Sequence, residues 1–178
     1  MDTTIEQGTF TCADIMSWGP CEAWPESRVR AALRGLPRNM TAEDVLRRDT
    51  IPAEDRLWVV LREECLDPRT LRLFACSSAQ RALERERAAG REPDPRSWAV
   101  VDVARRFAAG ETSTEELDAA WDAAWAAGAA AGAAARCAGA AARDAAWAAA
   151  AGDAARSAAG DAERERQVAD LLALLGAP

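Results

Sequence analysis

Apolar side chains recur along most of this chain at the three- and four-residue spacing of a helical face. One face is formed by Leu57, Trp58, Leu61 and Cys65, and another, near the C-terminus, by Val168, Leu171, Leu172 and Leu175. A face that repeats once per helical turn is buried against a neighbouring helix. The pattern therefore predicts an all-α protein, a helical bundle of about six or seven helices.

Cap residues and helix breakers divide this pattern into separate helices. Side chains that can accept a hydrogen bond from a first-turn amide are found at Thr41, Asp67, Asp94 and Ser113. Prolines at the first helical position and glycines that end a helix are found at Pro68, Pro95, Gly90 and Gly110. We therefore expect helices over residues 42–50, 53–66, 68–89 and 95–109, one from residue 114 onward, and a last one over 163–175.

The first 40 residues differ because glycine and proline interrupt them repeatedly, which leaves room for one helix over residues 26–33. We expect residues 1–54 to form an irregular segment with short helices, and residues 55–178 to form an Ala-rich helical bundle. Trp18 and Trp24 lie in the irregular segment. If either indole is exposed, it is a candidate anchor for a partner protein.

Residues 119–159 are more than half alanine, the residue with the highest helix propensity. A single rod of this length is unusual in a domain of this size, so we expect Gly139 or Gly152 to mark a turn between two Ala-rich C-terminal helices. Trp121 and Trp125 share a helical face, and we expect them to pack in the core.

Composition excludes most enzyme classes. The chain contains no His, Lys or Tyr, so acid–base chemistry would depend on Asp, Glu or Cys alone. We expect no catalytic residues, because the carboxylates lie on helices and caps and a cysteine nucleophile would lack its usual basic partner.

The five cysteines have no CxxC spacing, and without histidine they indicate buried thiols rather than a metal site. Cys12 and Cys21 are the pair close enough in sequence to meet across a turn. No cofactor is expected.

Charge and hydropathy restrict the partners and the location. The net charge of -7 repels nucleic-acid phosphates, so we expect no direct binding of nucleic acid. No apolar run approaches the length of a membrane span, and the N-terminus lacks the layout of a secretory signal. We expect a cytoplasmic protein that does not associate with membranes.

The strongest candidate for a binding surface is a cluster of acidic residues with no basic residue between Arg106 and Arg136 to neutralise it. The acidic surface comprises Glu111, Glu115, Glu116, Asp118 and Asp122. On a helix Glu115, Asp118 and Asp122 fall on one side, where they would contact a groove rich in basic residues. Acids are also favoured in a first helical turn by the helix dipole, so Glu115 and Glu116 have a structural explanation as well.

Several motifs over residues 55–175 resemble a group of Ala-rich bacterial and phage proteins, some of which are described as immunity proteins. The motifs are LRLFAC at 71–76, ARRFAAGE at 104–111, and the repeats AAWDAAW and AARDAAW. The resemblance implies an all-helical protein from bacteria or their phages, in a setting of toxins, immunity and anti-defence. It brings no catalytic residues with it.

These observations favour a non-catalytic inhibitor that binds and blocks a partner protein. An acidic inhibitor of the anti-CRISPR type, made by a phage or mobile element in the host cytoplasm, would block a nucleic-acid-binding defence complex through its acidic surface. One alternative is an immunity protein that neutralises a cognate bacterial toxin. Another is a self-assembling structural helical module, because faces rich in alanine pack well against copies of themselves.

Overall fold

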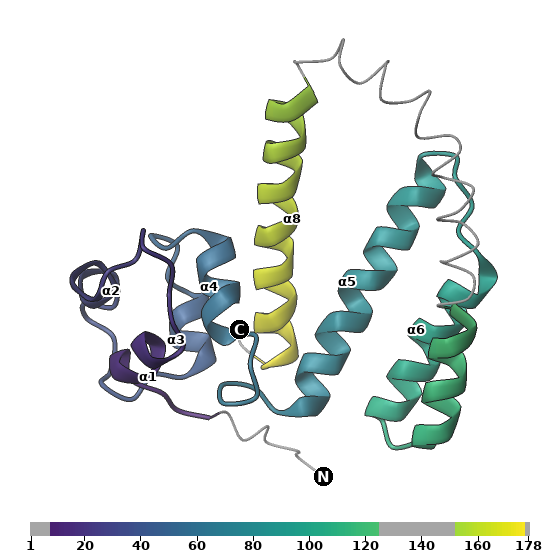
Figure 1. Cartoon of the computed structure of the whole chain (residues 1–178), viewed down its shortest axis with the longest axis horizontal. Helices are drawn as coiled ribbons and strands as arrows, with labels where there is room; N and C mark the ends of the chain where they lie inside the picture. The colour runs from purple at the N-terminus through teal and green to yellow at the C-terminus, as the bar shows by residue number, and fades with distance from the viewer. Residues whose placement is uncertain (1–7, 125–151, 177–178) are drawn as a thin grey trace. The chain divides into compact units, whose positions relative to one another are not determined.

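The computed structural model describes residues 8–124 and 152–176, with side chains for residues 8–124 and 160–176. The described chain is all-α, which confirms the fold class (Figure 1). Its helices are α1 (Cys12–Ser17), α2 (Glu26–Ala32), α3 (Ala42–Leu46), α4 (Ala53–Val60), α5 (Pro68–Ala88), α6 (Pro95–Ala108) and α8 (Gly152–Leu174), together with a helical segment over residues 114–124. The predictions for Trp125 and Gly139 lie outside the described residues.

The predicted caps and glycine stops are confirmed, but α3 ends at Leu46, earlier than the expected residue 50. At the start of α3, the Thr41 hydroxyl accepts a hydrogen bond from the Asp44 amide at 3.2 Å, and the Asp44 carboxylate accepts one from the Thr41 amide at 2.8 Å. Asp94 caps α6 by accepting from the Arg96 amide at 2.9 Å. Gly90 has a φ of 77° just after α5 ends, in the left-handed region that favours glycine.

The N-terminal segment contains a helix that the breaker pattern does not predict. The helix α1 begins with a second capping box, in which the Thr11 hydroxyl accepts from the Asp14 amide at 3.3 Å and Asp14 accepts from the Thr11 amide at 2.7 Å. Ile15 on α1 is 2% exposed and belongs to the core. The prediction of one helix in the first 40 residues is therefore wrong, because a capping box and one buried apolar residue stabilise this short helix.

The end of α4 is a further correction. The sequence pattern carries this helix to residue 66, but it ends at Val60, and Leu61 leaves the helical region with a ψ of 63°. The Arg62 guanidinium donates hydrogen bonds to the carbonyls of Trp58 and Val59 at 2.8 and 3.1 Å, so carbonyls of the last turn gain side-chain partners. Trp58 and Leu61 are 40% and 37% exposed, so the predicted buried face is wrong at these two positions.

The chain forms two compact units, of which unit 1 comprises residues 1–74 and 161–178. In unit 1, α3 packs against α4, and the part of α8 from residue 161 completes the core (Figure 1). Its most deeply buried side chains include Met40, Val45, Leu46, Val60, Leu66 and Leu171.

The units divide the chain differently from the expected boundary after residue 54, because core residues from both sides of that boundary pack together. The last helix also begins at Gly152, earlier than the expected residue 163.

A polar contact joins α4 to α8 within unit 1. Arg56 is 4% exposed, and its guanidinium donates to the Leu46 carbonyl at 2.8 Å and to both carboxylate oxygens of Glu165 at 2.7 and 2.9 Å. The Nη2 nitrogen alone donates to both oxygens of the carboxylate, while Nη1 donates to the Leu46 carbonyl. The Arg56 guanidinium therefore links α4 to α8 and to the end of α3.

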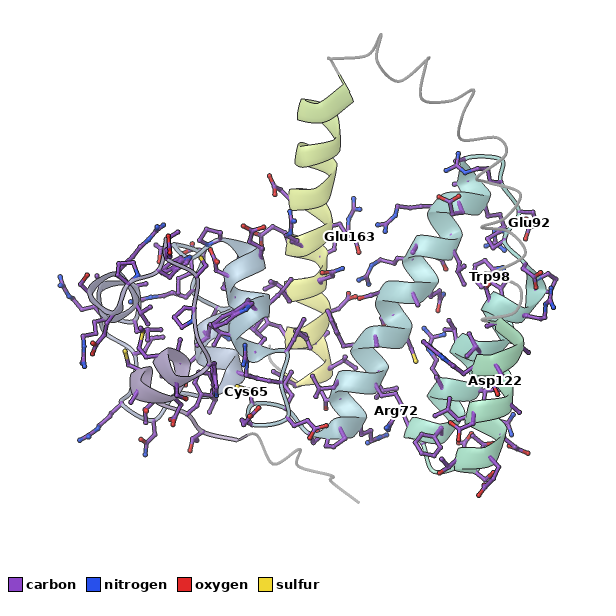
Figure 2. All side chains as sticks on the ribbon, viewed as in Figure 1. Cys65, Arg72, Glu92, Trp98, Asp122 and Glu163 are labelled. Atoms are coloured by element: carbon purple, nitrogen blue, oxygen red, sulfur yellow. The ribbon has the colours of Figure 1, made fainter. Side chains whose placement is uncertain are left out.

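Unit 2 comprises residues 75–160, and α6 follows α5 through a turn (Figure 1). Cys76, Val101 and Ala108 are its buried side chains among the described residues. Figure 2 shows Trp98 on α6, and the Arg87 guanidinium of α5 lies 4.9 Å from the centre of this indole. Trp121 is 60% exposed, so its expected place in the core is wrong.

Candidate binding surface and pocket

The acidic surface predicted from the sequence is exposed in unit 2. All five of its carboxylates belong to exposed residues, and four lie on the helical segment 114–124, where Figure 2 labels Asp122. The segment begins as predicted, because the Ser113 hydroxyl accepts a hydrogen bond from the Glu116 amide at 3.3 Å. Glu111 precedes it in the connection from α6.

Among the residues that the structure describes, the carboxylates of this surface are weakly compensated. The contact between Glu116 and Arg106 is long, at 3.9 Å, and both side chains are about half exposed, so solvent screens it. Hydrogen bonds from its own backbone amide and from Ser113 lower the pKa of Glu115 below its usual value. Glu115 is therefore fully charged at neutral pH, and the surface is negative under cellular conditions.

Trp121 adds an apolar side chain to this surface. The indole lies in sequence between Asp118 and Asp122 and is 60% exposed. The exposure of Trp121 is not visible in the sequence, because helical spacing alone cannot show whether a neighbouring element covers that face. An exposed tryptophan among charged groups is typical of protein interfaces, where indoles are enriched among the energetically dominant residues.

Trp18 and Trp24 are both half-buried, and each has partners within unit 1. The ring of Trp18 lies 5.5 Å from that of Phe10, at an interplanar angle of 52°. The Arg62 guanidinium lies 4.4 Å from the centre of Trp18 and 4.6 Å from the centre of Trp58, so one cation contacts two indoles. The roles of Trp18 and Trp24 as partner anchors stay predictions.

Trp24 forms part of a pocket in unit 1 that the sequence does not reveal. The pocket has a volume of about 350 Å³, and most of its lining is apolar. It is lined by Ile15, Pro20, Cys21, Trp24, Val29, Ala32, Leu33, Val45, Ile51, Glu54, Asp55, Trp58 and Val59. These residues come from α1 to α4 and the connections between them, so only the folded chain brings them together.

Contacts within unit 1 hold the two indoles of the pocket. The Arg28 guanidinium lies 4.2 Å from the centre of Trp24 and donates to the Ala23 carbonyl at 2.7 Å. The Trp24 side chain also favours the charged form of the Asp55 carboxylate. Trp58 has the corresponding contact with Arg62. The aromatic walls are thus positioned before any ligand binds, which lowers the entropic cost of binding.

The charged groups that line the pocket are two adjacent carboxylates, Glu54 and Asp55. Burial, and then the charge of Glu54, raise the pKa of Asp55 above its usual value, against the opposing effects of Trp24 and Arg28. Glu54 also contacts Arg164 of α8 at 3.3 Å, with both side chains substantially exposed. The pocket therefore carries negative charge that its surroundings only partly compensate.

The cysteines of the described chain differ in burial, since Cys21 is exposed whereas Cys65 and Cys76 are buried. Cys12, Cys21, Cys65 and Cys76 are all free thiols, so Cys12 and Cys21 are not joined. Burial raises the pKa of Cys65 to about 12, which keeps it protonated. Within residues 8–124 and 152–176, no group of three or more Cys, Asp or Glu is arranged to hold a metal ion.

No helix of these ranges is long and apolar enough to cross a membrane.

Comparison of the chain with protein-family models, with curated proteins and with solved structures finds no match. The resemblance of its motifs to Ala-rich immunity proteins therefore stays an expectation from the sequence.

Proposed function

We propose that this chain is a non-catalytic inhibitor that binds a partner protein and blocks its nucleic-acid-binding surface. In this proposal it is an anti-defence protein of the anti-CRISPR type, made by a phage or mobile element and acting in the cytoplasm of a bacterial host. The observation that carries the proposal is the exposed acidic surface with Trp121 within it.

Two properties of this surface suit such a partner. Its negative charge resembles that of nucleic-acid phosphates, so it would be attracted to the same basic groove and raise the rate of encounter. The Trp121 indole offers an apolar contact that phosphates lack, and it would lengthen the lifetime of the complex. Charge and an aromatic anchor together support a protein target.

The residue chemistry supports a binding role rather than catalysis. The chain has no histidine or lysine to act as a general base near neutral pH, and the Cys65 thiol is buried and protonated. Asp67, Asp94 and Ser113 serve as helix caps. Inhibition by occupying a surface requires none of the groups that are absent.

The second candidate is an immunity protein that neutralises a cognate toxin, which the same surface would support if the toxin presents a basic, apolar-lined cleft. The exposed Trp121 also supports the third candidate, self-assembly, because an indole in this position can contact a second copy. The three candidates differ in what the acidic surface captures.

The test is capture of partners by the tagged full chain from bacterial lysate at low and high salt, with the bound proteins identified by mass spectrometry. One variant reverses three acids of the surface, Glu115→Arg, Asp118→Arg and Asp122→Arg. A matched control reverses exposed acids elsewhere, Glu63→Arg, Glu64→Arg and Glu92→Arg. Both variants change the net charge from -7 to -1, because each reversal changes it by two.

We expect a nucleic-acid-binding defence complex at low salt, its loss at high salt, and its loss with the surface variant but not with the control. Equal capture by both variants would show that the acidic surface is not the contact. Recovery of a single toxin would favour immunity, and recovery of the chain alone would favour self-assembly.

A further inference from the structure

The pocket of unit 1 is separate from the acidic surface, which belongs to unit 2. Its volume of about 350 Å³ lies within the range of small-molecule sites. Its apolar lining and its two indoles can enclose a flat hydrocarbon or aromatic body. The pocket therefore has the size and the walls of a site for a small ligand.

The charge of the lining restricts the ligand further. Of the described side chains that line the pocket, the charged ones are Glu54 and Asp55, and both are acidic. Asp55 is half-buried, and the neighbouring Glu54 opposes its ionisation. Arg164 compensates Glu54 from outside the lining, through a solvent-exposed contact at 3.3 Å that solvent screens. A positive group in the pocket would relieve the repulsion between the two carboxylates, whereas a negative one would add to it.

The two indoles add aromatic and apolar contact to the acidic lining. The faces of Trp rings attract cations, and here Arg28 and Arg62 already lie 4.2 and 4.6 Å from the centres of Trp24 and Trp58. Because a guanidinium already lies over each ring, an ammonium group in the pocket would gain its electrostatic attraction from the carboxylates of Glu54 and Asp55. A neutral ligand would gain the apolar contacts alone.

We propose that this pocket binds a small organic cation with an aromatic or other apolar body, with the body between Trp24 and Trp58 and the positive group at Glu54 and Asp55. This inference does not rest on the proposed function. The pocket would give unit 1 a ligand-binding role whether or not the acidic surface of unit 2 binds a partner protein.

The test compares three probes that share an indole body and differ in charge, by isothermal titration calorimetry with the full chain at neutral pH. Tryptamine is a cation, tryptophol is neutral and indole-3-propionate is an anion. We expect tryptamine to bind about tenfold or more tightly than tryptophol, and indole-3-propionate to bind most weakly. Equal binding of the amine and the alcohol, tighter binding of the anion, or no binding of tryptamine would overturn the proposal.

Two variants test whether tryptamine binds in this pocket and not elsewhere on the chain. Glu54→Gln removes one charge from a side chain that is 60% exposed, so the fold is preserved. It should weaken tryptamine about fivefold and leave tryptophol unchanged, whereas the exposed Glu63→Gln, outside the lining, should change neither. Ala32→Phe fills the pocket and should abolish binding of both probes, with circular dichroism to confirm that the helices are intact. Unchanged tryptamine binding in both Glu54→Gln and Ala32→Phe would show that the cation binds elsewhere.

Discussion

Replacing Leu171 with alanine tests whether the end of α8 belongs to the core of unit 1. Leu171 is fully buried, and the substitution removes three carbon atoms from its side chain. At about 0.8 kcal/mol per buried carbon, the lost transfer free energy is roughly 2.4 kcal/mol, and the cavity left behind brings the loss to about 3–4 kcal/mol. This is a large part of the roughly 5–15 kcal/mol by which a domain is stable.

The assay is urea unfolding followed by circular dichroism at the helical minimum. We expect the midpoint of Leu171→Ala to fall by roughly 1–2 M urea with an unchanged slope. Arg166→Ala is the matched control on the same helix, because Arg166 is exposed, and its midpoint should change little. If Leu171→Ala unfolds at the same urea concentration as this control, α8 is not packed in the core and the description of unit 1 is wrong.

Two further predictions concern polar groups. Arg56→Ala leaves the Leu46 carbonyl and the Glu165 carboxylate without the hydrogen bonds that Arg56 donates. It should lower the free energy of unfolding by about 2 kcal/mol in the same urea assay. A change below about 0.5 kcal/mol would show that the contact does not hold α8. Burial raises the pKa of Asp67, but hydrogen bonds from Thr70 and neighbouring amides lower it by more, so the pKa is below its usual 3.8 in the fold. A lowered pKa stabilises the fold above the unfolded value of 3.8, and this contribution is lost as the pH falls through the lower folded value. Asp67→Ala should therefore cost about 1 kcal/mol at pH 7 and much less once the pH is below the folded pKa. A cost independent of pH would contradict the charged cap.

The features that depend on near neighbours could be predicted from the sequence. The helix caps at Thr41 and Asp94 and the helix stop at Gly90 involve groups only a few residues apart. The residue types at these positions therefore predict where the helices begin and end. Thr11 and Asp14 carry the same capping signal, although the glycines and prolines nearby favour an irregular chain. Local chemistry thus outweighed composition in the N-terminal segment.

The features that depend on long-range packing could not be predicted in this way. Trp58 and Leu61 fit a buried helical face by spacing, but the helix ends at Val60, so Leu61 no longer follows the periodicity. The exposure of Trp121 depends on whether another element covers its helical face, and the spacing of apolar residues in the sequence does not show this. The pocket is lined by residues of four helices and their connections, which only folding brings together, so no sequence motif predicts it.

The central claim is that the acidic surface competes with nucleic acid for a partner. The most direct measurement is DNA binding by the captured partner, followed by fluorescence anisotropy of a labelled duplex, as the full chain is added. We predict that one equivalent of the chain displaces the duplex, and that the Glu115→Arg, Asp118→Arg, Asp122→Arg variant fails to do so while the matched control succeeds. Retention of DNA by the partner at saturating amounts of the native chain would contradict the account.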